Sequence, residues 1–299
     1  MLIDVKTCLL VWFSWQFDKN IPRLDKLYGE RFPCRYYLMP FYQGDHPHTL
    51  PIYESSLHFQ NYFAQANKAL PQDADYYVIC GDDMILHPDL NEHNIIDFIG
   101  CQEQAYVKYI NAVTDHSFAW HRFSEALHFL DQYRAIPFYD MMPSREELIE
   151  IYKRHDISIS NIGLQNFKGV FDETISWERI KAGLKFFFSK DRKRFAEWPL
   201  VEGYSDFVVV PRKYWQKFVY YCGILGAMNV WHDCGVVTAL LLACEDILLE
   251  KDSPAFGVEL WKQEVEDLYQ QYKGDLQALL DDFKPNQIYT HPVKLSRWR

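Results

Sequence analysis

The chain has 299 residues, of which 48% are hydrophobic and 24% are charged, and its formal net charge at pH 7 is −10. This length and composition suit a sizeable core in one large domain or two small ones. The acidic balance argues against a general affinity for nucleic acid, which needs an excess of Lys and Arg. The seven cysteines include no CxxC pair, so we expect reduced thiols in a cytoplasmic protein, not a disulfide framework or a zinc site.

The apolar stretches are too short to cross a membrane. Asp4 and Lys6 interrupt the N-terminal segment, which therefore lacks the pattern of a signal peptide. The longest apolar run, residues 235–244, ends at Glu245 and Asp246, whereas a spanning helix needs about 20 apolar residues.

The first ninety residues alternate between strand and helix patterns. Such a β-α-β-α-β order is typical of a mostly parallel sheet with a ligand crevice at the carboxyl ends of its strands. The stretch contains neither GxGxxG nor GxxxxGK[ST], so neither a dinucleotide-binding fold nor a P-loop kinase is supported. The predicted strands are residues 7–13, 35–39 and 76–80, and the predicted helices are residues 21–32 and 53–70, with a loop at 40–51.

The middle of the chain is less regular. After a short helix at 90–100 and a strand at 105–113, residues 114–199 contain helical patterns at 123–133 and 145–155. We interpret 114–199 as a helical insertion on the acceptor side of a single domain. Its basic, aromatic stretch KFFFSKDRKRF, residues 185–195, predicts either contact with an anionic membrane surface or a solvated helix end.

The last third begins with the loop EGYSD and a strand at 207–210. Apolar patterns then predict helices at 212–228, 234–249 and 255–272, followed by an extended tail at 288–299. Asp233 would lie at the start of the second of these helices, where the helix dipole stabilises an acid.

Asp82 and Asp83 follow the predicted strand at 76–80. Two neighbouring carboxylates repel each other unless a cation lies between them, and their oxygens suit Mg²⁺ or Mn²⁺. The alternative is a turn that the aspartates cap.

Four features, in this order along the chain, resemble the GT-A fold of glycosyltransferases that use nucleotide-sugar donors. Asp82 and Asp83 resemble the metal-binding DxD-type motif, although Gly81 or Cys80, depending on the register, stands where that motif has its first acid. The loop around Gly203 resembles the glycine loop between donor and acceptor. Asp233 resembles the catalytic base of inverting members, and His291 resembles the histidine that completes the metal site.

The resemblance implies a mixed α/β sheet of the Rossmann type flanked by helices, with residues 1–113 as the nucleotide-binding half and 200–299 as the catalytic half and tail. It implies bound Mn²⁺ or Mg²⁺, a nucleotide-sugar donor with a UDP-sugar favoured, and a glycan or lipid-linked acceptor. The implied site residues are Asp83 and His291 for the metal, Trp12, Ser14 and Asp82 for the donor, Glu202, Gly203 and Asp206 for the acceptor, and Asp233 as base.

We therefore expect a metal-dependent, inverting glycosyltransferase of the bacterial capsule or lipopolysaccharide type, with peripheral contact at the inner face of the membrane. A sugar-phosphate nucleotidyltransferase is a second interpretation, although the loop at residues 14–18 lacks the glycines of its phosphate loop. A catalytically silent scaffold on the same fold is a third, and Gly81 is the feature that favours it.

Overall fold

A computed structural model describes residues 6–117, 120, 122–123, 126, 136–167, 177–188 and 198–299. Its centre is a mixed sheet in the strand order β10-β6-β9-β4-β1-β2-β3. Every neighbouring pair is parallel except that β9 runs antiparallel to both β4 and β6. The strands are β1 (Thr7–Trp12), β2 (Arg35–Pro40), β3 (Thr49–Ile52), β4 (Tyr76–Gly81), β6 (Ala105–Val107), β9 (Phe207–Pro211) and β10 (Ile247–Leu249).

The strand order reverses direction at β1. The chain moves outward from β1 to β2 and β3, and then returns to place β4 on the other side of β1. Such a reversal leaves a crevice beyond the carboxyl ends of the two central strands. The crevice of this sheet therefore lies where Trp12 and Gly81, paired in the β1–β4 ladder, end their strands.

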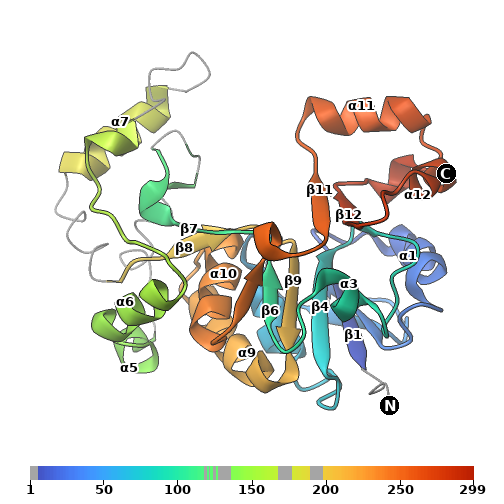
Figure 1. Cartoon of the computed structure of the whole chain (residues 1–299), viewed down its shortest axis with the longest axis horizontal. Coiled ribbons are helices and arrows are strands. Elements are labelled where there is room, and N and C mark those ends of the chain that lie inside the picture. Colours follow the sequence, from blue (N-terminus) through green and yellow to red (C-terminus); the bar gives the residue numbers. More distant parts are fainter. Residues whose placement is uncertain are drawn as a thin grey trace.

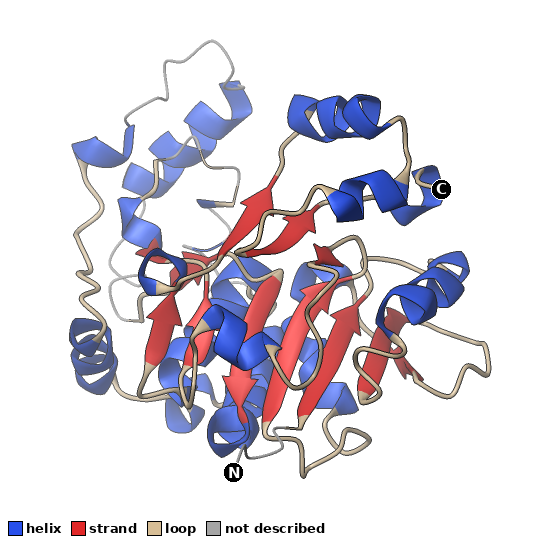
Figure 2. Cartoon of the chain, turned by 45° about the vertical axis from the view of Figure 1, so that its right-hand side comes forward, coloured by secondary structure: helices blue, strands red, loops and turns tan. Residues whose placement is uncertain are grey.

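Helices cover both faces of the sheet (Figure 2). The side chains of the sheet alternate between two hydrophobic clusters. On β1, Cys8, Leu10 and Trp12 pack in one cluster with α2, α9 and α10, whereas Leu9 and Val11 pack in the other with α1 and α3. Burial on both faces explains why β1 is apolar throughout. The helices are α1 (Ile21–Tyr28), α2 (Gln60–Ala66), α3 (Ile95–Ile99), α9 (Arg212–Ala227), α10 (His232–Ala243), α11 (Gln263–Tyr272) and α12 (Leu276–Asp281).

Two small sheets extend this core. One has the order β11-β12-β5 and places the late strand β12 beside the segment that follows β4, and the other pairs β7 with β8. Between β7 and β8 the described chain forms helices that lie to one side of the central sheet (Figure 1). These elements are β5 (Ile85–Leu86), β7 (Ile110–Ala112), β8 (Val201–Gly203), β11 (Phe256–Glu259), β12 (Gln287–His291), α5 (Phe138–Met141), α6 (Arg145–Arg154) and α7 (Trp177–Phe188).

The predicted fold class, a mixed α/β sheet flanked by helices with a helical insertion, is confirmed. Several predicted elements are wrong in detail. The predicted loop at 40–51 contains the start of strand β3, and the predicted strand at 105–113 is split into β6 and β7. The predicted helices at 234–249 and 255–272 each contain a strand, β10 and β11, because those residues pair with β6 and β12.

Most of the helical pattern at 123–133 lies outside the described residues, as do residues 189–195 of the basic stretch. Among the described residues, no helix is long and apolar enough to span a membrane.

Candidate functional site

A cavity of about 520 Å³ lies at the carboxyl ends of β1 and β4. The antiparallel strand β9 begins at this same edge, because Phe207 pairs with Cys80 at the end of β4. The cavity therefore lies at the place where the strand order predicts a crevice. The predicted site residues that line it are Trp12, Ser14, Asp83, Gly203, Asp206, Asp233 and His291.

Asp83 and His291 meet at one end of this cavity although 208 positions separate them in the chain. The backbone N–H of Val293 donates to the Asp83 carbonyl oxygen at 2.6 Å and ties the segment after β12 to the aspartate turn. His291 Nε2 lies 3.0 Å from Asp83 Oδ1, and its Nδ1 lies 2.7 Å from the Tyr204 hydroxyl. Asp206 Oδ2 lies 3.9 Å from the same Nδ1.

The electrostatics of His291 follow from these contacts. Burial acts to lower its pKa, but the hydrogen bond to Asp83 and the charges of Asp83 and Asp206 outweigh burial and raise the pKa to about 9. Without a metal, the imidazolium is therefore paired with Asp83 near neutral pH. The Tyr204 hydroxyl meets Nδ1, which leaves Nε2 directed at Asp83.

The spacing of this pair fits a divalent cation. Two neighbouring ligands of an octahedral ion, each about 2.1 Å from it, are about 3 Å apart, and Asp83 Oδ1 and His291 Nε2 are 3.0 Å apart. The described part of the chain contains no group of three or more His, Cys, Asp or Glu side chains that could hold a metal. An ion held by Asp83 and His291 would leave its other coordination positions to phosphate oxygens and water.

Asp82 is buried and does not line this cavity. Its Oδ1 accepts from the backbone N–H of Ser14 at 3.3 Å, and its Oδ2 accepts from Asn20 Nδ2 at 3.2 Å. Burial, reinforced by the charge of Asp83, raises the pKa of Asp82 to about 7. Asp82 thus holds the loop after β1, and its predicted contact with the donor stays a prediction.

The position of Gly81 also has a local explanation. A Cβ at this position would lie 3.2 Å from Asp83 Oδ1 and 3.5 Å from the Trp12 ring. The first of these contacts is tight and the second is an ordinary van der Waals contact, so a side chain at position 81 would press on the Asp83 oxygen that meets His291.

Asp233, in the first turn of α10, belongs to a second group of polar side chains on the cavity wall; we call this group the Asp233 end and the group around Asp83 and His291 the Asp83 end. Its Oδ1 accepts from the Ser205 hydroxyl at 2.6 Å and lies 3.2 Å from His232 Nδ1, while its Oδ2 accepts from Trp231 Nε1 at 2.9 Å. Burial acts to raise the pKa of Asp233, but the charge of His232 and these hydrogen bonds outweigh it and lower the pKa. Asp233 is therefore ionised and held in one orientation, with its side chain 30% exposed.

Asp206 lies between the two ends. Burial raises its pKa to about 6; His291 opposes this rise and the charge of Asp233 adds to it. A carboxylate with a raised pKa close to two others is a second candidate for proton transfer.

Two other predicted residues have structural roles. Glu202 is buried and does not line the cavity: its Oε1 accepts from Asn111 Nδ2 at 2.9 Å and lies 2.7 Å from His116 Nε2. Its predicted acceptor contact stays a prediction. Gly203 does line the cavity. A Cβ at this position would lie 2.1 Å from the Tyr109 carbonyl oxygen, so a side chain does not fit here unless the backbone shifts.

Trp12 is mostly core. It is 7% exposed and stacks on Phe59 with ring centroids 4.1 Å apart, so only a small part of it reaches the cavity. Phe13 is fully buried, whereas Trp15 is 60% exposed. Lys294 lines the cavity, whereas Arg35, which pairs with Asp25, and Lys108, which pairs with Glu250 and Glu259, do not.

Sequence reasoning missed several residues that build the site. Ser205 and Trp231 orient Asp233, and Tyr204 orients His291. The signal in the sequence was their position next to predicted site residues, in the EGYSD loop and just before Asp233. Tyr109, Glu259 and Trp261 also line the cavity but carry no comparable signal.

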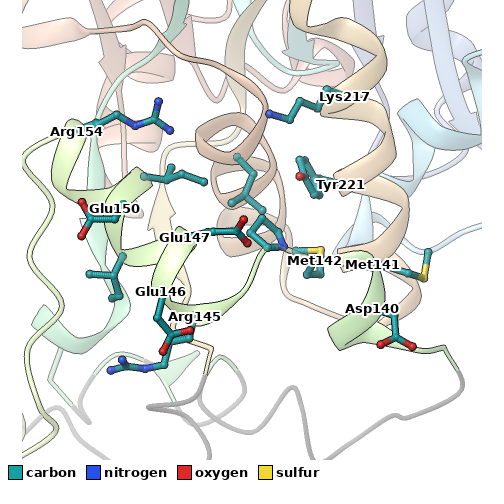
Figure 3. A pocket seen from close by; sticks show the side chains of 14 residues that line it. Asp140, Met141, Met142, Arg145, Glu146, Glu147, Glu150, Arg154, Lys217 and Tyr221 are labelled. Atoms are coloured by element: carbon teal, nitrogen blue, oxygen red, sulfur yellow. The ribbon is translucent and has the colours of Figure 1, made fainter.

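A larger cavity of about 870 Å³ lies between the helical insertion and α9 (Figure 3). Its wall includes Met142 and Tyr221, with Glu147, Arg154 and Lys217 among its charged groups. None of the predicted site residues lines it. Size alone therefore does not identify the functional site, and the chemistry gathers in the smaller cavity.

The sequence matches no protein-family model and no curated protein. Among solved structures, core-mannan synthase A from Aspergillus fumigatus in its Mn/GDP form is similar over 83% of this chain and 73% of that chain, with 8% identity and a TM-score of 0.36. The mannosyltransferase Ktr4p from S. cerevisiae is similar over 83% of this chain and 69% of that chain, with 10% identity and a TM-score of 0.37. With sequence identities and TM-scores this low, the similarity assigns neither an activity nor a residue role to this chain.

Proposed function

We propose that this chain is a divalent-metal-dependent glycosyltransferase that moves a sugar from a nucleotide-sugar donor to a glycan or glycolipid acceptor with inversion. The observation that carries the proposal is the pairing of Asp83 with His291 at the reversal point of the sheet, in the cavity that also contains Asp233. A phosphate-containing donor fits this crevice by the general behaviour of open α/β sheets.

The charge of the cavity explains why a donor diphosphate needs a cation. The acidic groups on its wall are Asp83, Asp206, Asp233, Glu259 and Glu266, and the lysines there are Lys262 and Lys294. Asp83 and His291 would hold Mn²⁺ or Mg²⁺, and Lys294 is placed to meet a phosphate oxygen. When bound, the ion neutralises the negative charge that develops on the leaving diphosphate.

Asp233 is the proposed general base. The acceptor hydroxyl oxygen forms a bond to the anomeric carbon, the bond from that carbon to the donor phosphate breaks, and the hydroxyl proton passes to Asp233. Ser205, Trp231 and His232 hold the carboxylate ionised and in one orientation, which is what a base needs before the acceptor arrives. Oδ2 accepts the Trp231 N–H and keeps a second lone pair for the proton.

The finer parts of the proposal are the pathway and the donor. We propose a UDP-sugar donor and a role in bacterial surface polysaccharide or lipopolysaccharide synthesis, in the cytoplasm. The resemblance in motif order supports the pathway, and the absence of paired cysteines in the sequence supports the compartment.

The test is a thermal-shift screen of nucleoside diphosphates and nucleotide sugars, each with Mn²⁺ and with EDTA. A ligand present at a hundredfold excess over its Kd stabilises the folded state by about 2.7 kcal/mol. We expect one nucleotide to raise Tm only when Mn²⁺ is present, and the preferred nucleotide to name the donor class.

Asp83→Asn should remove this Mn²⁺-dependent rise, whereas Asp252→Asn, an equal change at an exposed position outside the cavity, should keep it. If no nucleotide stabilises the wild type with Mn²⁺, the proposed function is wrong. If nucleotides bind but no acceptor releases the diphosphate, the chain is a binding protein on this fold.

A further inference from the structure

We propose that a further cavity, of about 530 Å³ between α1 and α12, binds a ligand that carries a phosphate group. We call it the basic cavity. It shares no lining residue with the candidate site, so the proposal does not depend on the chemistry proposed there. Its volume lies in the range of small-molecule pockets, about 300–1,000 Å³.

Three segments that are far apart in the sequence form the walls of the basic cavity. The first is α1 with the residues just after it, the second is Pro88, which follows β5, and the third is α12 together with Arg299. Helices α1 and α12 lie at the same side of the molecule, close to the C-terminus (Figure 1). The cavity therefore exists only in the folded protein.

All charged side chains on these walls are basic, namely Arg23, Lys26, Arg31 and Arg299. The whole chain carries a formal charge of −10, and the two cavities described above both include acidic side chains. The ion pairs in the described part of the chain involve none of these four cations. A cleft lined by charge of one sign concentrates ligands of the opposite sign.

Arg31 is held in place by backbone carbonyl oxygens. Its Nε donates to the Leu27 oxygen at 2.8 Å, and its Nη1 donates to three carbonyl oxygens in the segment 87–90, at 2.6, 2.8 and 3.0 Å. Its Nη2 has no hydrogen-bond acceptor among the described residues. Burial lowers the pKa of Arg31, and the charge of Asp89, which does not line the cavity, offsets part of this effect. The guanidinium is thus fixed before a ligand arrives, with one nitrogen left to donate.

Arg23 is anchored in a similar way on another wall. Its Nη1 donates to the carbonyl oxygens of Leu295 and Trp298, the second at 2.6 Å. Its Nε and Nη2 have no acceptor in the part of the chain that the structure describes. The backbone N–H of Arg299 donates to the Gly274 carbonyl oxygen at 2.7 Å, which holds Arg299 beside the start of α12. Two arginines with free N–H groups therefore stand on walls that the backbone fixes.

These cations suit a phosphate group better than a single carboxylate. A phosphate monoester carries close to two negative charges at pH 7, and the N–H groups of a guanidinium match its oxygens in pairs. The rest of the wall is largely apolar and half-buried, so it can contact a non-polar part of the ligand. The apolar residues are Leu27, Pro88, Leu276 and Leu280. Such a ligand is either a soluble phosphate ester or the headgroup of a phospholipid.

The experiment is calorimetric titration of the full chain with inorganic pyrophosphate in EDTA. EDTA removes the divalent ions through which pyrophosphate could bind at the Asp83 end. We expect saturable binding with one equivalent per chain, and an affinity that falls as salt is added.

Lys26→Gln with Arg299→Gln removes two of the four charges. Neither side chain donates a hydrogen bond within the described residues, and both are exposed, so Tm should stay close to that of wild type. Exposed ion pairs each change affinity by up to a fewfold, so the affinity for pyrophosphate should fall about tenfold.

Arg154→Gln with Lys217→Gln is the matched control. It removes the same two charges, also at exposed positions, from the wall of the larger cavity of about 870 Å³. Because those positions lie outside the basic cavity, affinity should stay within about threefold of wild type.

Glycerol phosphate and dihexanoyl phosphatidic acid then distinguish the two sources of phosphate. An affinity at least about tenfold higher for the phosphatidic acid identifies a lipid headgroup, and similar affinities identify a soluble phosphate ester. Either result supports the basic cavity as a phosphate site, provided that the Lys26 and Arg299 changes weaken binding of the same compound.

The proposal is overturned if wild type binds no pyrophosphate at millimolar concentration, or if the Lys26 and Arg299 variant binds as tightly as its control. Lys294→Gln tests the remaining possibility, because Lys294 lines the candidate site. If this change alone abolishes binding, pyrophosphate occupies the candidate site and the proposal is wrong.

Discussion

The two ends of the cavity stabilise their carboxylates in opposite ways. Around Asp233 the protein supplies every partner itself, because Ser205, Trp231 and His232 all contact the carboxylate and its pKa falls. Around Asp82 and Asp83 negative charge is in excess, and the pKa of Asp82 rises to about 7.

This difference separates two kinds of function. A carboxylate that the protein already satisfies is preorganised, and it acts without binding anything at its own oxygens. Asp83 has only His291 as its ion-pair partner within 4 Å among the described residues, and the charge of Asp83 still raises the pKa of its buried neighbour Asp82, so a cation at Asp83 would offset this excess of negative charge. Changes at the Asp233 end should therefore alter turnover, whereas changes at the Asp83 end should alter binding and the stability of the metal-free protein.

The largest expected effect is on turnover at the Asp233 end. Asp233→Asn keeps the side-chain shape, and its amide oxygen still accepts hydrogen bonds. Removal of a general base lowers kcat by about 10²–10⁴, while donor affinity should stay within a fewfold because Asp83 and His291 are intact. Steady-state kinetics beside a donor-binding titration measure both quantities.

Asp206→Asn is the matched variant for this prediction, because Asp206 is the other acid with a pKa suited to proton transfer, about 6. If Asp206→Asn loses the larger part of kcat and Asp233→Asn keeps near-normal turnover, then Asp206 is the base and Asp233 does not take the proton.

The second effect is on metal-dependent binding. Asp83→Asn removes an anionic ligand and leaves His291 with only the more distant Asp206 as an ion-pair partner among the described residues. Loss of a group that merely orients a ligand costs 10–100-fold in metal affinity, so loss of a ligand should cost at least about 100-fold. Calorimetric titration of Mn²⁺ in the presence of the nucleotide measures it, with Asp252→Asn as control. Unchanged affinity would remove Asp83 from the metal site.

The two ends also differ in how far the sequence could predict them. The acids after an apolar strand, the acid at the start of an apolar helix and the late histidine were visible as residue types in a given order, and the structure brings Asp83, Asp233 and His291 to one cavity. Strand β12 made the long-range part of this possible, since it pairs with β5 just after Asp83.

The orientation of individual side chains was not predictable in the same way. Asp82 and Asp83 are neighbours, but Asp82 turns toward Ser14 and Asn20, whose positions depend on a loop 62 to 68 residues earlier in the chain. Trp12 looked like a ligand contact because it ends a strand, yet it shares a sheet face with Cys8 and Leu10 and stacks on Phe59.

Two predicted helices were wrong for a related reason. Residues 247–249 and 256–259 fit an apolar pattern that a helix also satisfies, although Glu245 and Asp246 interrupt the first pattern close to the true end of α10 at Ala243. Their conformation is decided by partners elsewhere in the chain, because β10 pairs with Ala105–Val107 and β11 pairs with Gln287–His291. Tertiary pairing of this kind overrides local propensity.

A smaller effect concerns the hydrogen bond behind His291. Tyr204→Phe removes the hydroxyl that lies 2.7 Å from His291 Nδ1 but keeps the ring that stacks against Tyr289. We expect Mn²⁺ affinity to fall about tenfold, the lower end for a group that orients a metal ligand. Tyr109→Phe, which changes another tyrosine on the cavity wall, is the control. Equal affinities for Tyr204→Phe and wild type would show that packing alone orients His291.

The smallest expected effect is on the free energy of unfolding. Its measurement tests the excess of negative charge around Asp82 and Asp83. Asp82 is 2% exposed, and burial together with the charge of Asp83 raises its pKa to about 7. In the unfolded chain Asp82 ionises at about pH 3.9. Between these two values the unfolded chain loses the proton that the folded chain keeps, so the free energy of unfolding falls as the pH rises from about 4 to about 7. Asp82→Asn removes this penalty, and its amide oxygen can still accept from Ser14 or Asn20.

The gap between the two pKa values corresponds to about 4 kcal/mol above pH 7, but the amide oxygen replaces only one of the two hydrogen bonds that the carboxylate accepts, and a hydrogen bond to a charged group contributes about 1.5–3 kcal/mol. In EDTA at pH 7.5 we therefore expect Asp82→Asn to be more stable than wild type by about 1 kcal/mol, which corresponds to about 2 °C in Tm for a chain of this size. The difference should shrink toward pH 4, where folded and unfolded wild type hold the proton more equally. It should also shrink when Mn²⁺ is added, because a cation at Asp83 offsets the repulsion in the wild type. Urea unfolding at several pH values measures the free energies. A variant that is less stable than wild type at pH 7.5 would mean that the charged hydrogen bonds to the loop after β1 outweigh the repulsion, and that both ends of the cavity are satisfied by the protein alone.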